Sequence, residues 1–303
     1  MRTRRTFAVA LCAIALTATA ACGKDGSPAA GGNASSGGSA APALPTYTVK
    51  TDAKIDSPTL AEAKKRGQLI IGAKSDQPFL GWEDLATNDR SGFDIEIAKM
   101  IAADLGFSPQ QIKWQTLVSS QREPAISKGQ IDYYVGTYSI NDERKKSVSF
   151  AGPYYIAGQD LLVKADNTAI TGPDSVNGKN VCTATGSTSI KNIEKYSPKI
   201  TQFDTYSACV EKLMSGEVDA VTTDDSILKG YASKYAPKLK VVGQPFTKEN
   251  YGVGLNKDDK ALRDAINDAI KAHQDNGDWK KAYDATLGLS GSAAPTPPAL
   301  DRY

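Results

Sequence analysis

The chain has 303 residues, of which 40% are hydrophobic and 23% are charged, and its formal net charge is +2. This is ordinary globular composition, with enough length for two domains. No extended basic run is present, so the charge gives no support for a nucleic-acid partner. The single histidine, His273, and the lack of clustered Cys and His residues leave a zinc site almost without support.

Residues 1–21 have the pattern of a secretory signal peptide, with a basic start, a short apolar run and small residues at the end. The apolar run is too short and too rich in Ala and Thr for a membrane span. The small residues lead directly into Cys22, which resembles a bacterial lipobox and predicts cleavage before Cys22 and lipidation of that cysteine. Ordinary signal cleavage beside an incidental cysteine is the alternative.

Residues 22–50 are rich in Gly, Ser, Ala and Pro, a composition that cannot bury a core. They predict a flexible, lipid-anchored tether. Residues 290–303 have a similar composition and predict a disordered tail.

Between these segments, apolar runs alternate with helical patterns. Residues 68–74, 111–117 and 131–138 are typical of strands, and 122–129 of a short helix. Residues 92–106 place apolar side chains at helical spacing, and Gly106 ends this predicted helix.

A second alternating set follows. Strands are predicted at 180–185, 200–204 and 218–224, with helices from about residue 187 and over 207–216. A last helix is predicted over 261–288, and His273 lies near its apolar stripe, which indicates a packing or surface role. The alternation predicts an α/β fold with largely parallel sheets.

Cys182 and Cys209 are the two cysteines of the folded part. In an exported protein such a pair predicts a disulfide, with two buried thiols as the alternative.

Polar loops follow several predicted strands, at 73–79, 136–144, 184–189 and 222–226. Ligands of open α/β sheets bind beyond the carboxyl ends of the strands. In the third loop, Gly186 permits a tight turn, and the helix start behind it offers N–H groups that favour an anion.

The charged residues of these loops are complementary. Arg144 is suited to bind a carboxylate through two hydrogen bonds, and Asp224 is suited to bind a cation. One carboxylate site with one ammonium site describes an α-amino acid. Lys74 and Arg122 add two positive groups, which suggests a ligand with a second carboxylate.

Five motifs occur in a recognisable order: GFDIEIAKMIAADL, GTYSINDERKKSVSFAGPYY, NGKNVCTATGSTS, VDAVTTDD and YGVGLNKDDKALRDAINDAI. Together they resemble solute-binding protein family 3, the amino-acid-binding proteins of ABC importers, and most closely the glutamate-binding lipoproteins of actinobacteria. The resemblance covers about residues 59–287. It implies a two-lobed, periplasmic-binding-protein-like (type II) clamshell, in which each lobe is a mainly parallel sheet flanked by helices. Lobe 1 is expected at 55–157 plus 252–289 and lobe 2 at 158–251, with two hinge crossings.

The resemblance also implies roles for individual residues. Arg144 would bind the α-carboxylate of the ligand, and Asp224 would bind the α-ammonium group, helped by the backbone carbonyl of Thr137. The polar groups that help Arg144 would be Ser139, Ser187 and Thr188.

Family members selective for acidic amino acids carry basic residues and a hydroxyl at the positions of Lys74, Arg122 and Ser119. Phe79 or Tyr138 would cover the ligand, because the usual aromatic position on the 73–79 loop is Asp76 here. Surface ion pairs of Lys74 and Arg122 are the alternative.

The resemblance implies a binding protein without catalytic residues, metal or cofactor. It would be a monomer, anchored by lipid at the outer face of the cell membrane, that captures L-glutamate or L-aspartate by lobe closure and delivers it to ABC transporter permease subunits. Two alternatives are a cyclic-acid dehydratase on the same fold and an amino-acid sensor for a membrane kinase.

Overall fold

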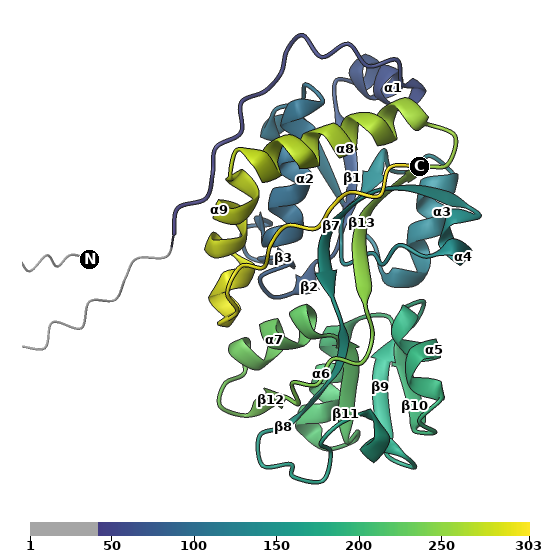
Figure 1. Ribbon diagram of the computed structural model, residues 1–303, viewed down its shortest axis with the longest axis vertical. Coiled ribbons are helices and arrows are strands. Elements are labelled where there is room, and N and C mark those ends of the chain that lie inside the picture. The colour runs from purple at the N-terminus through teal and green to yellow at the C-terminus, as the bar shows by residue number, and fades with distance from the viewer. Residues whose placement is uncertain (1–41) are drawn as a thin grey trace, which may run out of the picture. The chain divides into compact units, whose positions relative to one another are not determined.

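The computed structural model describes residues 42–303. The predicted signal peptide, the lipidation site Cys22 and residues 22–41 of the predicted tether lie outside the described residues. Two five-stranded sheets, each flanked by helices, form two lobes (Figure 1). We use lobe 1 for the body around the sheet β5-β1-β6-β13-β7 and lobe 2 for the body around the sheet β10-β9-β11-β8-β12. The predicted two-lobed α/β fold is confirmed.

Lobe 1 comes from both ends of the described chain. Its main strands are β1 (Leu69–Ala73), β5 (Ile112–Thr116), β6 (Tyr133–Tyr134), β7 (Val148–Ala157) and β13 (Glu249–Asn256). A small extra sheet contains β2 (Asp76–Gln77), β3 (Gly81–Glu83) and β4 (Arg90–Ser91). Its helices are α1 (Pro58–Arg66), α2 (Phe93–Asp104), α3 (Arg122–Ser127), α4 (Asp142–Lys145), α8 (Lys260–Asp275) and α9 (Asp278–Ala285), with short 3-10 turns η1 (Pro109–Gln111), η2 (Ser119–Gln121) and η4 (Leu287–Ser290).

Lobe 2 is one continuous segment. Its strands are β8 (Gln159–Lys164), β9 (Asn180–Ala184), β10 (Lys199–Phe203), β11 (Ala220–Asp224) and β12 (Leu239–Val241). Its helices are α5 (Thr188–Glu194), α6 (Tyr206–Ser215) and α7 (Asp225–Lys234), with the 3-10 turn η3 (Pro173–Val176).

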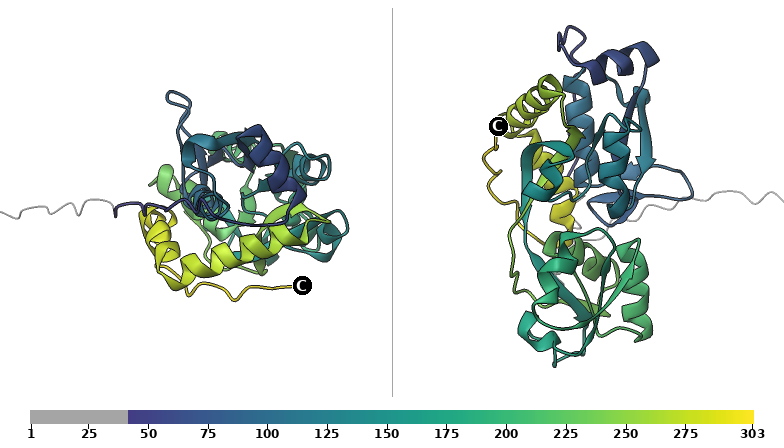
Figure 2. Two further views of the ribbon diagram at one scale, coloured as in Figure 1. Left: turned by 90° about the horizontal axis from the view of Figure 1, so that it is seen from above. Right: turned by 90° about the vertical axis from the view of Figure 1, so that its right-hand side faces the viewer.

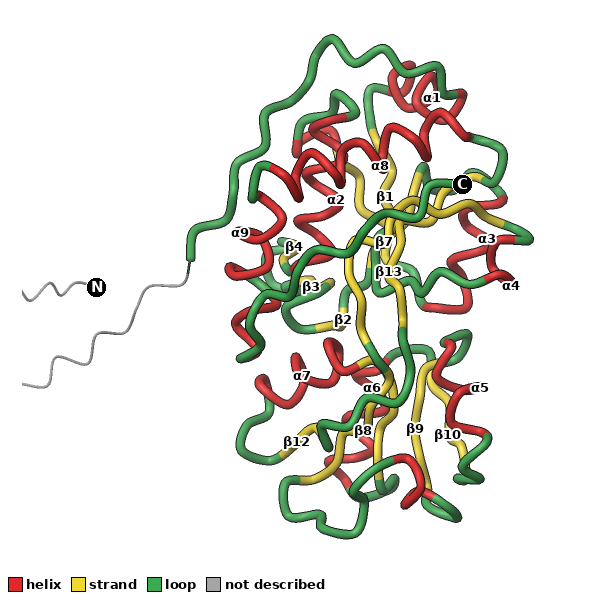
Figure 3. Tube along the Cα trace, in the orientation of Figure 1, coloured by secondary structure: helices red, strands yellow, loops and turns green. Residues whose placement is uncertain are grey.

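The sheets are mixed and not mainly parallel as expected. In lobe 1, β1 is parallel to β5 and β6, whereas β13 is antiparallel to β6 and β7. Lobe 2 repeats this pattern, with β8 antiparallel to β11 and β12. The antiparallel strands are those that carry the chain between the lobes, β7 into β8 and the return into β13 (Figure 3). A strand that returns beside its outgoing neighbour must run against it, which the local sequence pattern does not show.

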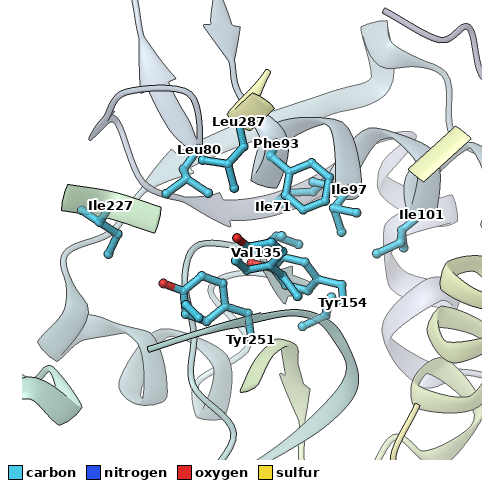
Figure 4. Close-up of a cluster of buried hydrophobic side chains, with 14 of the residues drawn as sticks. Ile71, Leu80, Phe93, Ile97, Ile101, Val135, Tyr154, Ile227, Tyr251 and Leu287 are labelled. Atoms are coloured by element: carbon cyan, nitrogen blue, oxygen red, sulfur yellow. The ribbon is translucent and has the colours of Figure 1, made fainter. Parts of the chain in front are cut away.

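Helix α2 shows how the local sequence sets a boundary. Gly92 precedes it with φ +116°, and a Cβ at this position would lie 2.2 Å from the carbonyl oxygen of Leu80, so glycine is required. Phe93, Ile97 and Ile101 then recur at helical spacing and are fully buried in the core of lobe 1 (Figure 4).

The helix predicted over 261–288 is divided into α8 and α9. Gly277 adopts a left-handed conformation (φ +86°) between them and lets the chain turn. His273 is buried, with its Nδ1 3.0 Å from Asp278 and its Nε2 3.6 Å from Asp104. Of the two roles that the sequence left open, packing or surface, His273 therefore has a buried one, beside two carboxylates.

The disulfide predicted between Cys182 and Cys209 is confirmed, with a Cα–Cα distance of 5.5 Å. It joins β9 to α6 in lobe 2 across a sequence separation of 27 residues. Closing a loop of this size stabilises the folded state by about 3–4 kcal/mol.

The core is continuous between the lobes. Ile227 of α7 belongs to the same cluster as Leu80 and Leu287 of lobe 1, and Figure 4 shows the three side chains in one region. The lobes thus share apolar contact as well as two chain crossings. None of the helices within residues 42–303 is long and apolar enough to cross a membrane.

The end of the predicted tether is docked on lobe 1. Residues 42–50 contain no helix or strand. Lys50 N–H donates to the carbonyl of Ala103 (2.9 Å), and the hydroxyl of Tyr47 donates to Glu96 (3.0 Å). Both partners belong to α2.

Residues 291–303 differ from the predicted disordered tail, because they run as an extended segment against lobe 1 (Figure 2). Asp301 N–H donates to the carbonyl of Gly152 (2.7 Å) in the edge strand β7. The ring of Tyr303 lies between two cations, 4.1 Å from Lys145 Nζ and 4.2 Å from Arg263 Cζ. The low-complexity composition hid these anchors, which act through contacts distant in sequence.

We predict that Tyr303→Ala lowers the free energy of unfolding by about 2 kcal/mol, because it removes two cation–π contacts and the hydrogen bond from Phe150 N–H to the Tyr303 hydroxyl. Urea denaturation measures this. Arg302→Ala is the matched control: its ion pair with Asp268 is exposed and is worth at most about 1 kcal/mol. Equal, small effects of the two substitutions would show that the tail contributes no specific anchor.

Candidate functional site

The polar strand ends of both lobes converge on one small cavity. Its lining comes from the predicted residues Ser119, Arg122, Thr137, Ser139, Arg144, Ser187, Thr188 and Asp224, together with Tyr206. The first five belong to lobe 1 and the others to lobe 2. A larger open groove is also lined by Ser139, Arg144, Ser187 and Thr188, so these four residues border both the cavity and the groove.

Two buried guanidinium groups form the lobe 1 wall. Arg122 donates to the carbonyls of Ser119 (2.9 Å), Thr137 (3.4 Å) and Gly186 (3.2 Å). Arg144 donates to the carbonyls of Ser139 (2.7 Å) and Gly186 (3.2 Å).

Arg144 also forms an ion pair with Glu123, with 3.1 Å between Nε and Oε1. A guanidinium has five N–H donors. Within residues 42–303, Arg122 uses three of them in hydrogen bonds and Arg144 uses two, beside its ion pair with Glu123. Both guanidiniums therefore keep N–H donors for a ligand.

Tyr138 does not cover the cavity. Its ring is fully buried and lies 4.3 Å from Arg122 Cζ and 4.9 Å from Arg144 Cζ, and it packs against Phe150 in the core. The ring therefore supports the two guanidiniums through cation–π contact. The prediction of a cover placed this side chain on the wrong side of the arginines.

Phe79 does not line the cavity either. It lines a separate apolar pocket with Trp82 and Lys234. The aromatic side chain that lines the cavity is Tyr206, from the first turn of α6 in lobe 2. Tyr206 is not among the residues predicted from the sequence. The sequence feature that points to Tyr206 is its position three residues before Cys209. The disulfide of Cys209 holds this turn of α6 beside β9.

Lys74 lies next to the cavity without lining it. Lys74 is 4% exposed, and its ammonium group donates to the hydroxyl of Ser119 (2.8 Å), which does line the cavity. Burial, followed by the neighbouring charge of Arg122, lowers the pKa of Lys74 to about 7. Lys74 is therefore a buried, titratable cation and not half of a surface ion pair.

Thr137 is held in an uncommon backbone conformation, with φ +46°. Its N–H donates to Asp94 (3.1 Å), and its hydroxyl lies 3.2 Å from both polar atoms of the Gln77 side chain. Asp94 also accepts a hydrogen bond from the Tyr154 hydroxyl (2.7 Å). Burial raises the pKa of Asp94 to about 7. Asp94 and Gln77 thus position the Thr137 carbonyl, a role that the sequence analysis did not assign.

Lobe 2 contributes the loop before α5. The Gly186 carbonyl accepts from both arginines across the cleft. A Cβ at Gly186 would lie 2.7 Å from Ser120 Cα, so only glycine allows the loop to approach lobe 1 this closely. Ser187 caps α5 with its backbone, and Thr188 donates its hydroxyl to Glu249 (3.1 Å). Helix α5 has only seven residues, so its helix dipole contributes little to the cavity. Its contribution comes from individual N–H and O–H donors.

Asp224, at the end of β11, supplies a carboxylate to the cavity. Its Oδ2 accepts a hydrogen bond from Tyr251 (2.7 Å). Its Oδ1 is buried and has no hydrogen-bond donor within residues 42–303. Burial, followed by the charge of Glu249, raises the pKa of Asp224 to about 8. A cationic group in the cavity would satisfy Oδ1 and favour the ionised form.

The cavity thus combines two guanidiniums, several hydroxyl and carbonyl groups and one carboxylate. Residues 42–303 contain no group of three or more His, Cys, Asp or Glu side chains that could hold a metal ion. This set of groups can bind a zwitterion that carries an additional negative charge.

The chain is similar to several known proteins. The family described as bacterial extracellular solute-binding proteins, family 3, matches residues 69–288. The chain is 40% identical over 241 residues to the glutamate-binding protein GluB of Corynebacterium efficiens, covering 76% of this chain and 82% of the relative. It is 39% identical to a glutamine-binding protein of Geobacillus stearothermophilus, covering 69% and 80%.

A solved structure of an ancestral amino acid-binding protein, a precursor of cyclohexadienyl dehydratase, has 30% identity and a TM-score of 0.68, covering 76% of this chain and 99% of the other. The likeness to GluB and the family match both extend over most of the chain. The chain therefore belongs to the bacterial extracellular solute-binding proteins, family 3.

Proposed function

We propose that this protein is the extracytoplasmic substrate-binding component of an ABC importer, with L-glutamate as its preferred ligand and L-aspartate as its second. The similarity to GluB supports glutamate. The nearly equal similarity to a glutamine-binding protein means that the choice between the two ligands depends on the cavity itself.

The observation that carries this proposal is the charge balance of the cavity. Arg144 pairs with the ligand's α-carboxylate, and the unsatisfied Oδ1 of Asp224 pairs with the α-ammonium group. Arg122 remains as a second buried guanidinium, backed by Lys74 through Ser119. A neutral side chain would leave this positive charge uncompensated in a buried site, whereas a side-chain carboxylate neutralises it.

Capture takes place by closure of the lobes around the ligand. Lobe 1 supplies Arg122, Arg144 and Ser139, and lobe 2 supplies Asp224 and Thr188. Neither lobe alone provides partners for both charges of the α-amino-acid group. The ligand therefore binds the closed arrangement better than the open one, which is the condition for ligand-driven closure. We place the lobe boundaries at 55–157 plus 252–289 and at 158–251, so the second crossing divides β13 after Tyr251.

The protein would act at the outer face of the cell membrane, as a monomer held by lipid at Cys22, and deliver its ligand to permease subunits. The family description supports a place outside the cytoplasm. An amino-acid sensor for a membrane kinase would capture the ligand in the same way and differ only in its partner.

A dehydratase needs a free acid or base beside the ligand. The two spare carboxylates near the mouth, Asp76 and Glu83, do not line the cavity. Asp76 accepts hydrogen bonds from Ser207 N–H and Tyr231, and Glu83 pairs with Arg90 at 2.8 Å. Both are occupied. The carboxylate that does line the cavity, Asp224, would be engaged by the α-ammonium group in the proposed complex, which favours binding without chemistry.

Arg144→Ala should weaken glutamate binding by about 2–5 kcal/mol, at least thirtyfold, because it leaves the α-carboxylate unpaired in a buried site. Isothermal titration calorimetry measures the loss. Lys146 is an exposed neighbour of Arg144. Lys146→Ala also removes one positive charge and, as the control, should leave the affinity unchanged. Binding by the Arg144 variant within about threefold of wild type would remove Arg144 from the site.

Glutamine should bind at least about a hundredfold more weakly than glutamate, because its neutral amide leaves Arg122 without a counter-charge. Arg122→Met should weaken the binding of glutamate much more than that of glutamine. It should therefore reduce the discrimination between the two ligands. Competition of both amino acids against labelled glutamate tests this. Glutamine binding as tightly as glutamate would overturn the specificity and leave the family assignment unaffected.

The affinity for glutamate should depend on pH with a maximum between about 7 and 8. Below the Asp224 pKa of about 8, binding of an ammonium group must expel the proton of Asp224, so the affinity rises with pH. Above the Lys74 pKa of about 7, binding of a side-chain carboxylate must protonate Lys74, so the affinity falls.

Calorimetry in buffers of different ionisation enthalpy should therefore detect proton release at the acidic end of the range and proton uptake at the alkaline end. Lys74→Met should remove the alkaline decrease and leave the acidic limb. An affinity that stays constant across this range would contradict both pKa assignments.

A further inference from the structure

Asp76 of lobe 1 contacts two helices of lobe 2. Its Oδ2 accepts hydrogen bonds from Ser207 N–H of α6 (3.1 Å) and from the Tyr231 hydroxyl of α7 (3.2 Å). The Tyr231 hydroxyl has one proton, which it shares with the backbone carbonyl of Asp76 at the shorter distance of 2.6 Å. One residue of a two-residue strand thus holds both helices that face it.

Asp76 supplies a hydrogen-bond acceptor to the first turn of α6. Ser207 lies in the first turn of α6, where backbone N–H groups have no partner within the helix. The neighbouring Ala208 N–H is capped from within lobe 2 by the hydroxyl of Thr205 (3.3 Å). The carboxylate of Asp76 therefore completes the cap of α6 from the opposite lobe, where negative charge is also favoured by the helix dipole.

The surrounding contacts join the same two bodies. Lys234 of α7 places its Nζ 3.6 Å from the centre of the Trp82 ring in β3. At Gly230 of α7, a Cβ would lie 2.5 Å from the carbonyl oxygen of Pro78, so this helix can approach β2 only because residue 230 is glycine. Asp76 sits within a close interface and not at an isolated surface contact.

The segment that carries Asp76 also supports the cavity. Gln77, the next residue, bonds to Thr137, and Lys74, two residues earlier, bonds to Ser119. Thr137 and Ser119 both line the cavity. A change in the position of residues 74–77 therefore alters the cavity wall and the interlobe contact together.

We propose that Asp76 is a positioning residue that latches lobe 2 onto lobe 1, through its cap on α6 and its hydrogen bonds with Tyr231, and thereby slows ligand release. It touches α6 and α7, whereas the ligand is held by the residues that line the cavity, and Asp76 is not one of them. The latch does not depend on which amino acid the cavity accepts.

Hydrogen exchange of single amides tests the latch without any ligand. In the wild-type protein, the Ser207 amide should exchange slowly. In Asp76→Ala it should exchange at least about tenfold faster, because its acceptor is gone, while the Ala208 amide keeps its rate. Asp89→Ala is the matched control, since Asp89 is an exposed carboxylate on the loop between β3 and β4. Equal Ser207 rates in wild type and Asp76→Ala would overturn the proposal.

Ligand release gives a second, separate measurement, made by stopped flow with L-glutamate or with the amino acid that gives the largest thermal shift. Asp76→Ala and Tyr231→Phe should each raise the dissociation rate several-fold while the association rate changes by less than about twofold. Asp76→Asn keeps one acceptor oxygen for Ser207 and should fall between wild type and Asp76→Ala.

The double variant Asp76→Ala, Tyr231→Phe should release ligand faster than Asp76→Ala, because the bond from the Tyr231 hydroxyl to the backbone carbonyl of residue 76 remains in the single variant. The effects of the two substitutions should be less than additive, because both remove the contact at Oδ2. An effect on association alone would show that Asp76 acts on the cavity directly and not as a latch. If glutamate fails to bind, the proposed specificity falls, and the exchange result still decides the latch.

Discussion

The structure depends on the burial of two guanidiniums and one carboxylate around a single cavity. Arg122, Arg144 and Asp224 are each less than a tenth exposed. Such charges are costly to bury unless hydrogen bonds or opposite charges compensate them. Here the carbonyls of Thr137, Ser139 and Gly186 accept from the arginines, and Glu123 pairs with one of them. The compensation is incomplete, because Asp224 Oδ1 lacks a donor within the described residues, and this is what suits the cavity to a zwitterion.

The scaffold keeps these partners in place through buried contacts that lie behind the cavity. Asp94, from the first turn of α2, holds the N–H of Thr137 in its left-handed conformation. Tyr138 supports both guanidiniums from the core side. A backbone conformation of this kind costs about 1–3 kcal/mol and persists only where the surroundings fix it. The motif around α2 therefore serves the site as well as the fold.

The lobes meet on two sides of this charge cluster. On one side, Gly186 of lobe 2 reaches the two arginines of lobe 1. On the other, β2 and β3 of lobe 1 meet α6 and α7 of lobe 2 through Asp76 and Trp82. The contact through Gly186 uses the two arginines that a ligand engages. The contact through Asp76 and Trp82 uses none of the groups that a ligand engages. A closed arrangement thus draws on ligand-dependent and ligand-independent contacts, and their balance sets how firmly a ligand is held.

The sequence by itself determined the alternation of strands and helices, the polar loops at the strand ends, the charge types in those loops and the cysteine pair, because periodicity, turn residues and charge are local properties. Only the tertiary structure decided that β7 and β13 pair antiparallel, that Tyr206 and not Tyr138 lines the cavity, that the tail anchors Tyr303 between two cations, and that Asp76 contacts α6 and α7. The direction of a side chain and its partner in a distant segment depend on how the elements pack, and no short stretch of sequence carries that information.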